Sequence, residues 1–222
     1  MKRYLIVGQG GIGSALAEKI KANSDEVFIL TRKKNLFPDS LCFEDLDTFL
    51  NEFIPDYVIN TIGILHDETH MPEKNVSQIR ENWLQKSINV NVMSAIILAQ
   101  ALDKYLKRDS ILKFMNISAR VSSISDNRLG GWYSYRMSKS ALNMFVKTLA
   151  IEWSRQYPKS AVYAYHPGTV DTELSKPFQK NINPEKLFTP NSASEHLLSV
   201  LEKLTVEDSG SMYDWAGEKI AY

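Results

Sequence analysis

The sequence predicts an α/β protein built on a doubly wound parallel sheet of about seven strands flanked by helices. Short apolar runs alternate along the chain with stretches of helical periodicity, which is the order expected of strands joined by crossover helices. The first apolar run, residues 3–7, ends in a glycine-rich turn that leads directly into a helical pattern. The 222 residues suffice for one domain of ordinary size. We therefore expect a single Rossmann-type domain over residues 1–222.

Each expected element follows from its local pattern, strands from short apolar runs and helices from longer periodic stretches. The expected strands are residues 3–7, 26–30, 41–43, 56–60, 112–117, 161–165 and 212–215. The expected helices are residues 12–22, 47–53, 76–106, 131–156 and 192–204. Residues 32–40 contain Pro38 and lack helical periodicity, so we expect a loop there in place of a crossover helix.

Composition and charge exclude several classes of function. The 26 basic residues are balanced by 26 acidic ones, so no global field attracts nucleic acid or an anionic membrane. The most apolar interior stretch, residues 92–99, is far shorter than the roughly 18 residues that a membrane span needs. The apolar run at the start stops at Gly8 without a cleavage-like segment, so no secretory signal is visible. The single cysteine, Cys42, excludes an intrachain disulfide, and the expected location is cytoplasmic.

The turn after the first strand has the spacing of a dinucleotide-binding loop. Residues 8–13 read Gly-Gln-Gly-Gly-Ile-Gly and satisfy G-x-G-x-x-G between a strand and a helix. The glycines permit a tight turn and a close backbone approach to a pyrophosphate, whose charge is met by the helix N-terminus. The alternative is a glycine-rich turn without a ligand. The predicted cofactor-binding residues here are Gly8, Gly10, Gly11, Ile12 and Gly13.

The end of the second strand favours NADP(H) over NAD(H). Residues 30–34 read Leu-Thr-Arg-Lys-Lys and contain no acidic residue that would bind the adenosine ribose and repel a 2′-phosphate. A guanidinium suits bidentate contact with a phosphate, so we assign Thr31 and Arg32 to that group. The alternative is a solvated basic turn.

Tyr135 and Lys139 are one helical turn apart, so their side chains share one face of the expected helix 131–156. A neighbouring ammonium favours the phenolate and lowers the pKa of the tyrosine. A phenol tuned in this way can pass a proton to or from a substrate oxygen near neutral pH. Most pairs with this spacing are merely a solvated helix face, and only the other motifs of the chain favour a catalytic interpretation.

Taken in order, these motifs resemble the short-chain dehydrogenase/reductase family over essentially the whole chain. Residues 8–13 resemble its glycine loop, one residue shorter than T-G-x-x-x-G-I-G, and residues 60–63 (Asn-Thr-Ile-Gly) stand where N-N-A-G is usual. Residues 89–101 resemble N-V-x-G…Q-A, residues 135–139 match Y-x-x-x-K, and residues 167–172 match P-G-x-V-x-T. Residues 63–66, 71–74, 130–143 and 209–215 also resemble the C-factor and sniffer-type carbonyl reductase branch.

The resemblance implies an NADP(H)-dependent oxidoreductase that moves a hydride between the nicotinamide and a carbonyl or alcohol carbon. Tyr135 would give or take the proton, Lys139 would stabilise the phenolate and bind the nicotinamide ribose, and Asn91 would hold a relay water. The resemblance also implies pairing through the two long helices, 76–106 and 131–156, so a homodimer or homotetramer is expected. The alternative is that all their apolar residues pack against the sheet. Further cofactor contacts are implied for Asp45, Asn60, Gly63, Pro167, Gly168 and Val170.

One position departs from the family pattern. The substrate-orienting serine, usually second in an I-S-S segment after the fifth strand, is matched here by Ala119, which cannot hydrogen-bond a carbonyl. Ser118 or Ser122 could fill this catalytic role through a shifted backbone, or could be turn residues bonded to their own backbone. A second function therefore stays open, a dinucleotide-binding signalling or scaffold protein with little turnover, in line with the signalling association of the C-factor group.

The remaining candidates have weaker signals. His66 and His70 have i, i+4 spacing, but no further ligands are evident, so no metal site is predicted and a loop near the mouth of the active site is favoured. His166 is at a strand end and could face the cofactor, but a satisfied structural histidine is favoured. Trp132 and Tyr133 are either core aromatics or a substrate wall. Residues 173–188, which should cover the substrate, have no interpretable chemistry, so the substrate is not identified.

Overall fold

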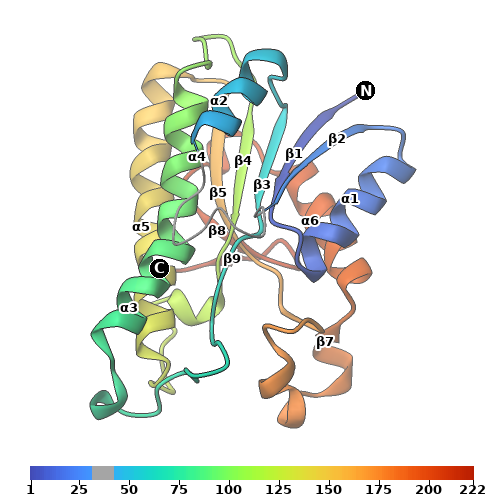
Figure 1. Ribbon diagram of the computed structural model, residues 1–222. Helices are drawn as coiled ribbons and strands as arrows, with labels where there is room; N and C mark the ends of the chain where they lie inside the picture. Colours follow the sequence, from blue (N-terminus) through green and yellow to red (C-terminus); the bar gives the residue numbers. More distant parts are fainter. Residues whose placement is uncertain (32–42) are drawn as a thin grey trace.

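A seven-stranded, mostly parallel sheet forms the centre of the computed structural model, which describes residues 1–31 and 43–222 (Figure 1). Arg32, Cys42, the expected loop at residues 32–40 and most of the expected strand 41–43 lie outside the described residues. The strand order is β2-β1-β3-β4-β5-β8-β9, and only β9 runs antiparallel to its neighbour. The strands of this sheet are β1 (Arg3–Val7), β2 (Glu26–Leu30), β3 (Tyr57–Asn60), β4 (Lys113–Ile117), β5 (Ala161–His166), β8 (Met212–Asp214) and β9 (Lys219–Ile220).

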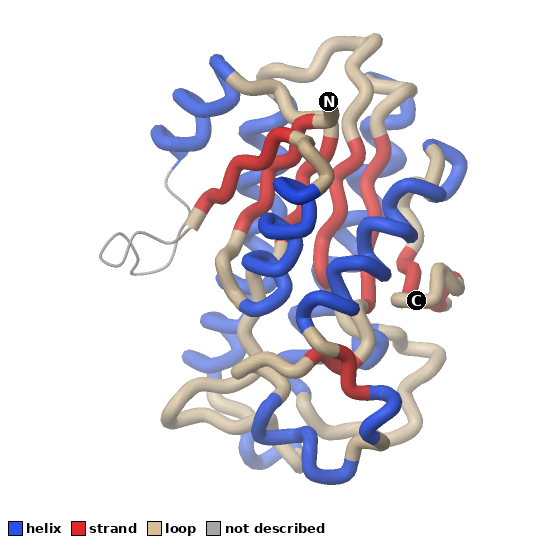
Figure 2. The backbone as a smooth tube through the Cα atoms, turned by 90° about the vertical axis from the view of Figure 1, so that its right-hand side faces the viewer, coloured by secondary structure: helices blue, strands red, loops and turns tan. Residues whose placement is uncertain are grey.

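Helices cover both faces of the sheet. In Figure 1, α4 (Ser94–Asp103) and α5 (Tyr133–Gln156) lie on one face, and α1 (Gly11–Ala22) and α6 (Pro190–Lys203) lie on the other. Figure 2 is turned so that the second pair of helices crosses in front of the strands. This arrangement is the doubly wound α/β fold that the alternating pattern predicts.

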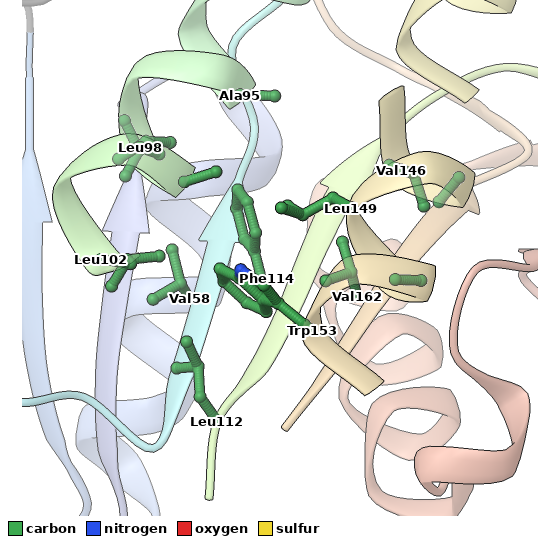
Figure 3. Packing of buried hydrophobic residues seen from close by; sticks show 14 of the residues in the cluster. Val58, Ala95, Leu98, Leu102, Leu112, Phe114, Val146, Leu149, Trp153 and Val162 are labelled. Atoms are coloured by element: carbon green, nitrogen blue, oxygen red, sulfur yellow. The ribbon is translucent and has the colours of Figure 1, made fainter. Parts of the chain in front are cut away.

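Alternate residues of each strand supply the two cores. In β4, Phe114 packs toward α4 and α5, whereas Met115 packs toward α1 and α6. Figure 3 shows Phe114 at the centre of the first core, beside Trp153 of α5, with ring centroids 6.3 Å apart. Because both faces of the strands are covered, the runs are nearly continuous in apolar residues, as is usual for a parallel sheet.

Several boundaries differ from expectation. Phe43 begins a helix, α2 (Phe43–Glu52), and is not the last residue of a strand. The expected helix 76–106 is divided into a 3₁₀ turn (Val76–Gln78), α3 (Glu81–Ile88), a π-helical turn (Asn89–Met93) and α4, because Ile79 and Arg80 are extended. The strand β9 and the pair β6 (Thr169–Val170) and β7 (Leu187–Phe188) have two residues each, too few for a periodic signal.

The remaining turns are short. Further 3₁₀ turns cover Arg120–Ser122, Lys176–Asn181, Pro184–Lys186 and Val206–Asp208.

Three long segments follow the carboxyl ends of β3, β4 and β5 and extend from the lower end of the sheet in Figure 1. Ligands of doubly wound sheets bind at this end. Among the described residues, no helix is long and apolar enough to cross a membrane.

Candidate active site

The glycine turn after β1 is tight at its ends and open in its middle. Gly8 has φ +106°, and a β-carbon on it would lie 2.6 Å from Oγ1 of Thr61. A β-carbon on Gly13 would lie 2.1 Å from the carbonyl oxygen of Gly8, so neither position accepts a side chain. A β-carbon on Gly10 would meet nothing within 4 Å. The turn therefore has the close packing and the open backbone that a bound pyrophosphate requires.

The start of α1 has free donors for an anion. Gly10 is the N-cap residue and no side chain caps the helix there, so the first backbone N–H groups, including those of Gly11 and Ile12, keep their hydrogen-bonding capacity. Gly8 donates its N–H to the carbonyl of Leu30 at 2.9 Å, so the end of β2 lies beside the turn. Thr31 follows as an exposed residue. The backbone of Asp45 belongs to α2, and its side chain is not described.

Asn60 organises the end of β3. Its Nδ2 donates to Oδ1 of Asn116 at 3.1 Å and to Oγ of Ser94 at 3.2 Å, and its Oδ1 accepts from the N–H of Ile62 at 3.2 Å. The side chain is 2% exposed. Asn60 is therefore a buried link between two strands and α4, and it shapes the turn that leads to Gly63.

Asn91 lies in the π-helical turn between α3 and α4, and its amide is fully engaged. Its Oδ1 accepts from the N–H of Ile64 at 2.8 Å, while its Nδ2 donates to the carbonyl of Ile64 at 3.0 Å and to Oγ of Ser138 at 2.9 Å. These bonds hold the segment after β3 against α5. π-Helical turns are rare and frequently occur at functional sites.

Tyr135 and Lys139 lie on the first two turns of α5, and both side chains are buried. Nζ of Lys139 is 5.9 Å from the centroid of the Tyr135 ring and donates to the carbonyl of Ile117, the last residue of β4, at 2.8 Å. A β-carbon on Gly63 would lie 3.4 Å from this Nζ and 3.3 Å from Oδ1 of Asn91. Four sequence-predicted residues from three separate segments thus meet at one place.

Burial changes the proton affinities of the pair. It raises the pKa of the Tyr135 phenol well above its ordinary value and lowers the pKa of Lys139 to about 7. The first direction is opposite to the sequence expectation that Lys139 lowers the pKa of Tyr135. The reason is that loss of solvent disfavours the charged form of each group. In this structure a neutral phenol faces an amine that titrates near neutral pH.

The serine candidates after β4 are turned away from this pair. The Ser118 hydroxyl donates to Oδ1 of Asn143 at 2.7 Å, and the Ser122 hydroxyl donates to the carbonyl of Ala119 at 2.6 Å. Nδ2 of Asn143 in turn donates to Oγ of Ser122 at 2.6 Å. By contrast, Ala119 is in the apolar cluster that includes Tyr135. The structure brings Ala119 to the phenol and holds both hydroxyls in a buried network of their own.

The segment after β5 approaches the glycine turn. Pro167 is buried, and Gly168 has φ +76°, with Phe188 only 2.6 Å from the place of a β-carbon. Val170 is buried in β6, which pairs with β7. A β-carbon on Gly11 would lie 2.7 Å from Cγ2 of Thr172, so this segment and the phosphate turn are neighbours.

The histidines have structural contacts. Nε2 of His66 lies 3.1 Å from the carbonyl of Leu174, and the His70 ring stacks on Trp83 with centroids 4.7 Å apart. The described residues contain no group of three or more His, Cys, Asp or Glu that could hold a metal ion. Burial lowers the pKa of His166 to about 4, and its Nδ1 has no hydrogen-bond partner among the described residues, so the two interpretations of this histidine both stay open.

Sequence reasoning missed most of the side chains that surround Tyr135. Leu65 and Ala119 are buried with it, and four partly buried apolar side chains pack against them. Trp132 was one of two open alternatives, whereas Phe178 belongs to a segment without interpretable chemistry. The only sequence signal for them is an apolar or aromatic residue near a motif. The four partly buried residues are Val121, Trp132, Leu174 and Phe178.

Comparison with known proteins decides the family. The family model described as short chain dehydrogenase matches residues 51–183, which is more than half of the chain. The chain belongs to the short-chain dehydrogenase family. It is therefore an oxidoreductase of a family that typically uses a nicotinamide dinucleotide, a cofactor that the glycine turn fits.

The relatives of this chain include a protein with a signalling name and proteins named as reductases. The chain is 27% identical over 140 residues to C-signal of Myxococcus xanthus, covering 63% of this chain and 78% of that protein. It is 25% identical over 248 residues to benzil reductase ((S)-benzoin forming) of Bacillus subtilis, covering 96% and 98%. The crystal structure of NADPH-bound carbonyl reductase from chicken fatty liver matches with a TM-score of 0.78 and 21% identity, covering 100% and 99%. That structural likeness confirms the predicted fold.

Proposed function

We propose that this dehydrogenase is an NADPH-dependent carbonyl reductase in which Tyr135 transfers the proton. The observation that carries the proposal is the meeting of Tyr135 and Lys139 with Gly63 and Asn91 beyond the carboxyl ends of β3 and β4. A phenol and an amine side by side at this end of a doubly wound sheet suit proton transfer to a bound carbonyl.

The residues present fit a dinucleotide. The open backbone at Gly10 and the uncapped start of α1 suit a pyrophosphate. The close approach of Gly63 to Lys139 suits a ribose lying over a residue without a side chain. When bound, the reduced nicotinamide supplies the hydride.

NADPH is proposed in preference to NADH because residues 30–34 carry Thr31 and Arg32 and no acid. The carbonyl reductase from chicken fatty liver, which shares the fold, binds NADPH in its crystal structure. One charge-assisted phosphate contact is worth roughly 1.5–3 kcal/mol, so NADPH should bind about ten- to a hundredfold more tightly than NADH. Calorimetric titration with each nucleotide measures this difference, and tighter binding of NADH would contradict it.

In the reductive direction Tyr135 must hold the proton before the reaction. Burial raises the pKa of this phenol, so it stays protonated at neutral pH and can donate to the substrate oxygen. The ammonium form of Lys139 stabilises the phenolate that is left. Because the pKa of Lys139 is about 7, this group can exchange a proton at neutral pH. The side-chain amide of Asn91 is occupied by Ile64 and Ser138, so any relay water at this residue would have to bind its backbone. We assign Ser118 no contact with the substrate, since its hydroxyl donates to Asn143.

The proposal is tested by Tyr135→Phe, which keeps the ring and removes the proton donor. Reduction of carbonyl compounds should fall by at least about 10²-fold if general acid catalysis operates. NADPH binding should persist, because the glycine turn is untouched. Tyr133→Phe is the matched control, since it removes a partly buried hydroxyl two residues earlier on the same helix and should have little effect. Equal activity of Tyr135→Phe and wild type would mean that the tyrosine is structural.

A second candidate function is a dinucleotide-binding signalling or scaffold protein. The observation that favours it is the alanine at position 119, with both nearby serine hydroxyls directed elsewhere. The relative named C-signal has a signalling name and no enzymatic one. Firm NADPH binding without turnover of any member of a carbonyl panel would favour this candidate over the reductase.

We also infer a homodimer or homotetramer formed through α5. Three exposed apolar side chains of this helix are spaced seven residues apart and so share one face: Met137, Met144 and Ile151. Apolar residues aligned in this way are typical of a surface that another molecule covers. A second copy of the chain would present the same stripe, as a two-fold interface requires.

A further inference from the structure

The residues directly before α5 have an unusual backbone. Gly130, Gly131 and Trp132 all have positive φ, of 62°, 64° and 53°. Two glycines adopt this region without strain, but a bulky aromatic residue there is a genuine outlier. Residues in such conformations persist only where the surroundings determine them, and they cluster at functional sites. Contacts from other parts of the chain must therefore hold Trp132 in place.

Two charged side chains hold this left-handed turn. The Arg136 guanidinium donates to three backbone carbonyls, of Gly131 at 2.9 Å, of Gly130 at 3.1 Å and of Val121 at 2.9 Å. The other fixed point is Glu73, which is 3% exposed and comes from the segment after β3.

Glu73 binds the first residues of α5 through its backbone and its carboxylate. Its carbonyl accepts from the N–H of Trp132 at 2.6 Å, and its carboxylate accepts from the N–H of Ser134 at 3.2 Å and from the Ser134 hydroxyl. A carboxylate at a helix N-terminus is also favoured by the helix dipole. The turn is therefore fixed from two sides, before the helix that carries Tyr135 begins.

The left-handed conformation of Trp132 places its indole ring beside Tyr135 and Phe178. The Trp132 ring meets the Tyr135 ring edge-on, with centroids 6.3 Å apart, and lies 4.9 Å from the Phe178 ring. Phe178 is held in turn by His66, at 5.7 Å between ring centroids. Trp132 and Phe178 are both only partly buried, so each retains aromatic surface that a ligand can contact.

The chemistry around the phenol is aromatic and aliphatic. Leu65 and Ala119 are buried in one cluster with Tyr135, and Ala119 stands where a hydroxyl would otherwise help to orient a carbonyl. A carbonyl held by one hydrogen bond needs its remaining atoms fixed by shape. A planar ring packed against two aromatic side chains meets that need, because aromatic pairs have preferred geometries.

We propose that Trp132 and Phe178 form an aromatic wall that selects aryl ketones, and that Arg136 and Glu73 are positioning residues for Trp132. The proposal rests on the proposed reductase function and adds its substrate class. The competing interpretation is that Trp132 only attaches residues 171–189 to the rest of the molecule.

The test compares two ketones of equal size, acetophenone and cyclohexyl methyl ketone, which differ in having a planar or a puckered ring. Trp132→Ala should lower kcat/KM for acetophenone by about tenfold or more, and that for the cyclohexyl ketone by less than about threefold. The quantity compared between variants is the ratio of kcat/KM for acetophenone to kcat/KM for the cyclohexyl ketone. The intrinsic reactivity of each ketone cancels in this comparison. Leu129→Ala is the matched control, since it truncates a 93% exposed apolar side chain three residues earlier and should not change the ratio. An equal loss for both ketones would overturn the proposal.

The positioning role is tested by Arg136→Met, which removes the two bonds to the turn and the one to Val121. It should shift the ketone ratio in the same direction as Trp132→Ala, whereas a purely structural loss would lower both rates alike. If Trp132→Ala does not fold, Trp132→Leu and Phe178→Leu provide the same comparison. An unchanged ratio in these folded variants would refute the aromatic wall.

Binding separates this proposal from the reductase function. Saturation-transfer NMR of acetophenone with Tyr135→Phe loaded with NADPH reports contact without turnover. If wild type reduces neither ketone but acetophenone binds in a Trp132-dependent manner, the aromatic wall stands and the reductase function fails. If the ketones are reduced but acetophenone binding is independent of Trp132, the wall fails and the reductase function stands.

Discussion

At the scale of single residues, the site depends on what burial does to two groups. A buried phenol without a charged partner in hydrogen-bonding distance keeps its proton, while a buried amine gives its proton up more readily. In the proposed function, Tyr135 donates its proton to a carbonyl and Lys139 helps to replace that proton afterwards. Ala119 removes the usual second donor, which places the whole task of binding the substrate oxygen on Tyr135 in our proposal.

This pairing predicts an activity that declines with rising pH. Lys139 is charged below its pKa of about 7 and neutral above it, so stabilisation of the phenolate is lost as the pH rises through 7. The kcat/KM for ketone reduction should therefore fall between pH 6 and pH 9, by about tenfold per unit at its steepest if one proton is required. Initial rates across this range test it, with Lys139→Met as the control that should lack the titration. A flat wild-type profile would contradict the assignment.

The free energy of unfolding should rise with pH, whereas the activity should fall. The folded-state pKa of Lys139 is below the ordinary value of 10.5, so the unfolded chain binds more protons between about pH 7 and 10.5. The contribution of Lys139 to folding free energy therefore becomes more favourable as the pH rises through that window. The difference in melting temperature between wild type and Lys139→Met, measured at several pH values, isolates this contribution from those of other groups.

At the scale of elements, α5 joins Tyr135 and Lys139 to the core and to the outer surface. Its first turn carries Tyr135, its second carries Lys139, its inner face packs on the sheet through Trp153, and its outer face carries the stripe centred on Met144. The 24 residues of this helix are long enough for all four roles. Because α5 is fixed at its start by Glu73 and along its length by the core, it holds Tyr135 and Lys139 on a rigid support.

The outer stripe of α5 predicts self-association. Met144→Lys places a charge in the middle of the stripe, where burial against a second copy would leave that charge unpaired. The variant should sediment as a monomer at micromolar concentration, while wild type sediments as a dimer or tetramer. Met71→Lys, which makes the same change at an exposed site in a loop, is the control. A wild-type monomer under these conditions would refute the inference.

The elements also show where sequence reasoning succeeds. Helix α5 and the first three parallel strands were predictable because long periodic patterns and short apolar runs dominate their local energetics. The left-handed conformation of Trp132 was not, because contacts with Glu73 and Arg136 determine it and those come from tertiary structure. The break at residues 79–80 and the π-helical turn at Asn91 likewise depend on neighbours that a one-dimensional pattern does not contain.

The candidate site was predictable to a similar degree. Tyr135, Lys139 and the glycine turn follow from motif spacing, and Asn91 follows from the family resemblance. The structure brings Tyr135, Lys139 and Asn91 together with Gly63. Their chemical roles remain proposals. The direction of the tyrosine pKa was predicted wrongly, because spacing reports proximity to a lysine but does not report loss of solvent. Phe178 had no sequence signal, since it becomes part of the site only when residues 171–189 fold back toward α5.

At the scale of the whole molecule, an open glycine turn and an apolar cluster around Tyr135 lie along one edge of the sheet. The turn after β1 leaves backbone open at Gly10, while segments after β3, β4 and β5 surround the phenol with apolar side chains. The contact between Gly11 and Thr172 joins the two parts. A dinucleotide bound along this edge would have its phosphates at one end and its reactive ring near Tyr135.

The central claim is that Tyr135 assists hydride transfer from NADPH to a ketone. Its most direct test uses two samples of NADPH, one with deuterium at the pro-S position of C4 and one at the pro-R position, and follows transfer of the label to acetophenone. Two samples are needed because the hydride can leave from either face of the nicotinamide. Wild type should produce 1-phenylethanol with deuterium on the carbinol carbon from one of the two samples, and Tyr135→Phe should produce at least about 10²-fold less in the same time. Alcohol without label from both samples, or equal labelled product from wild type and Tyr135→Phe, would contradict hydride transfer assisted by this tyrosine.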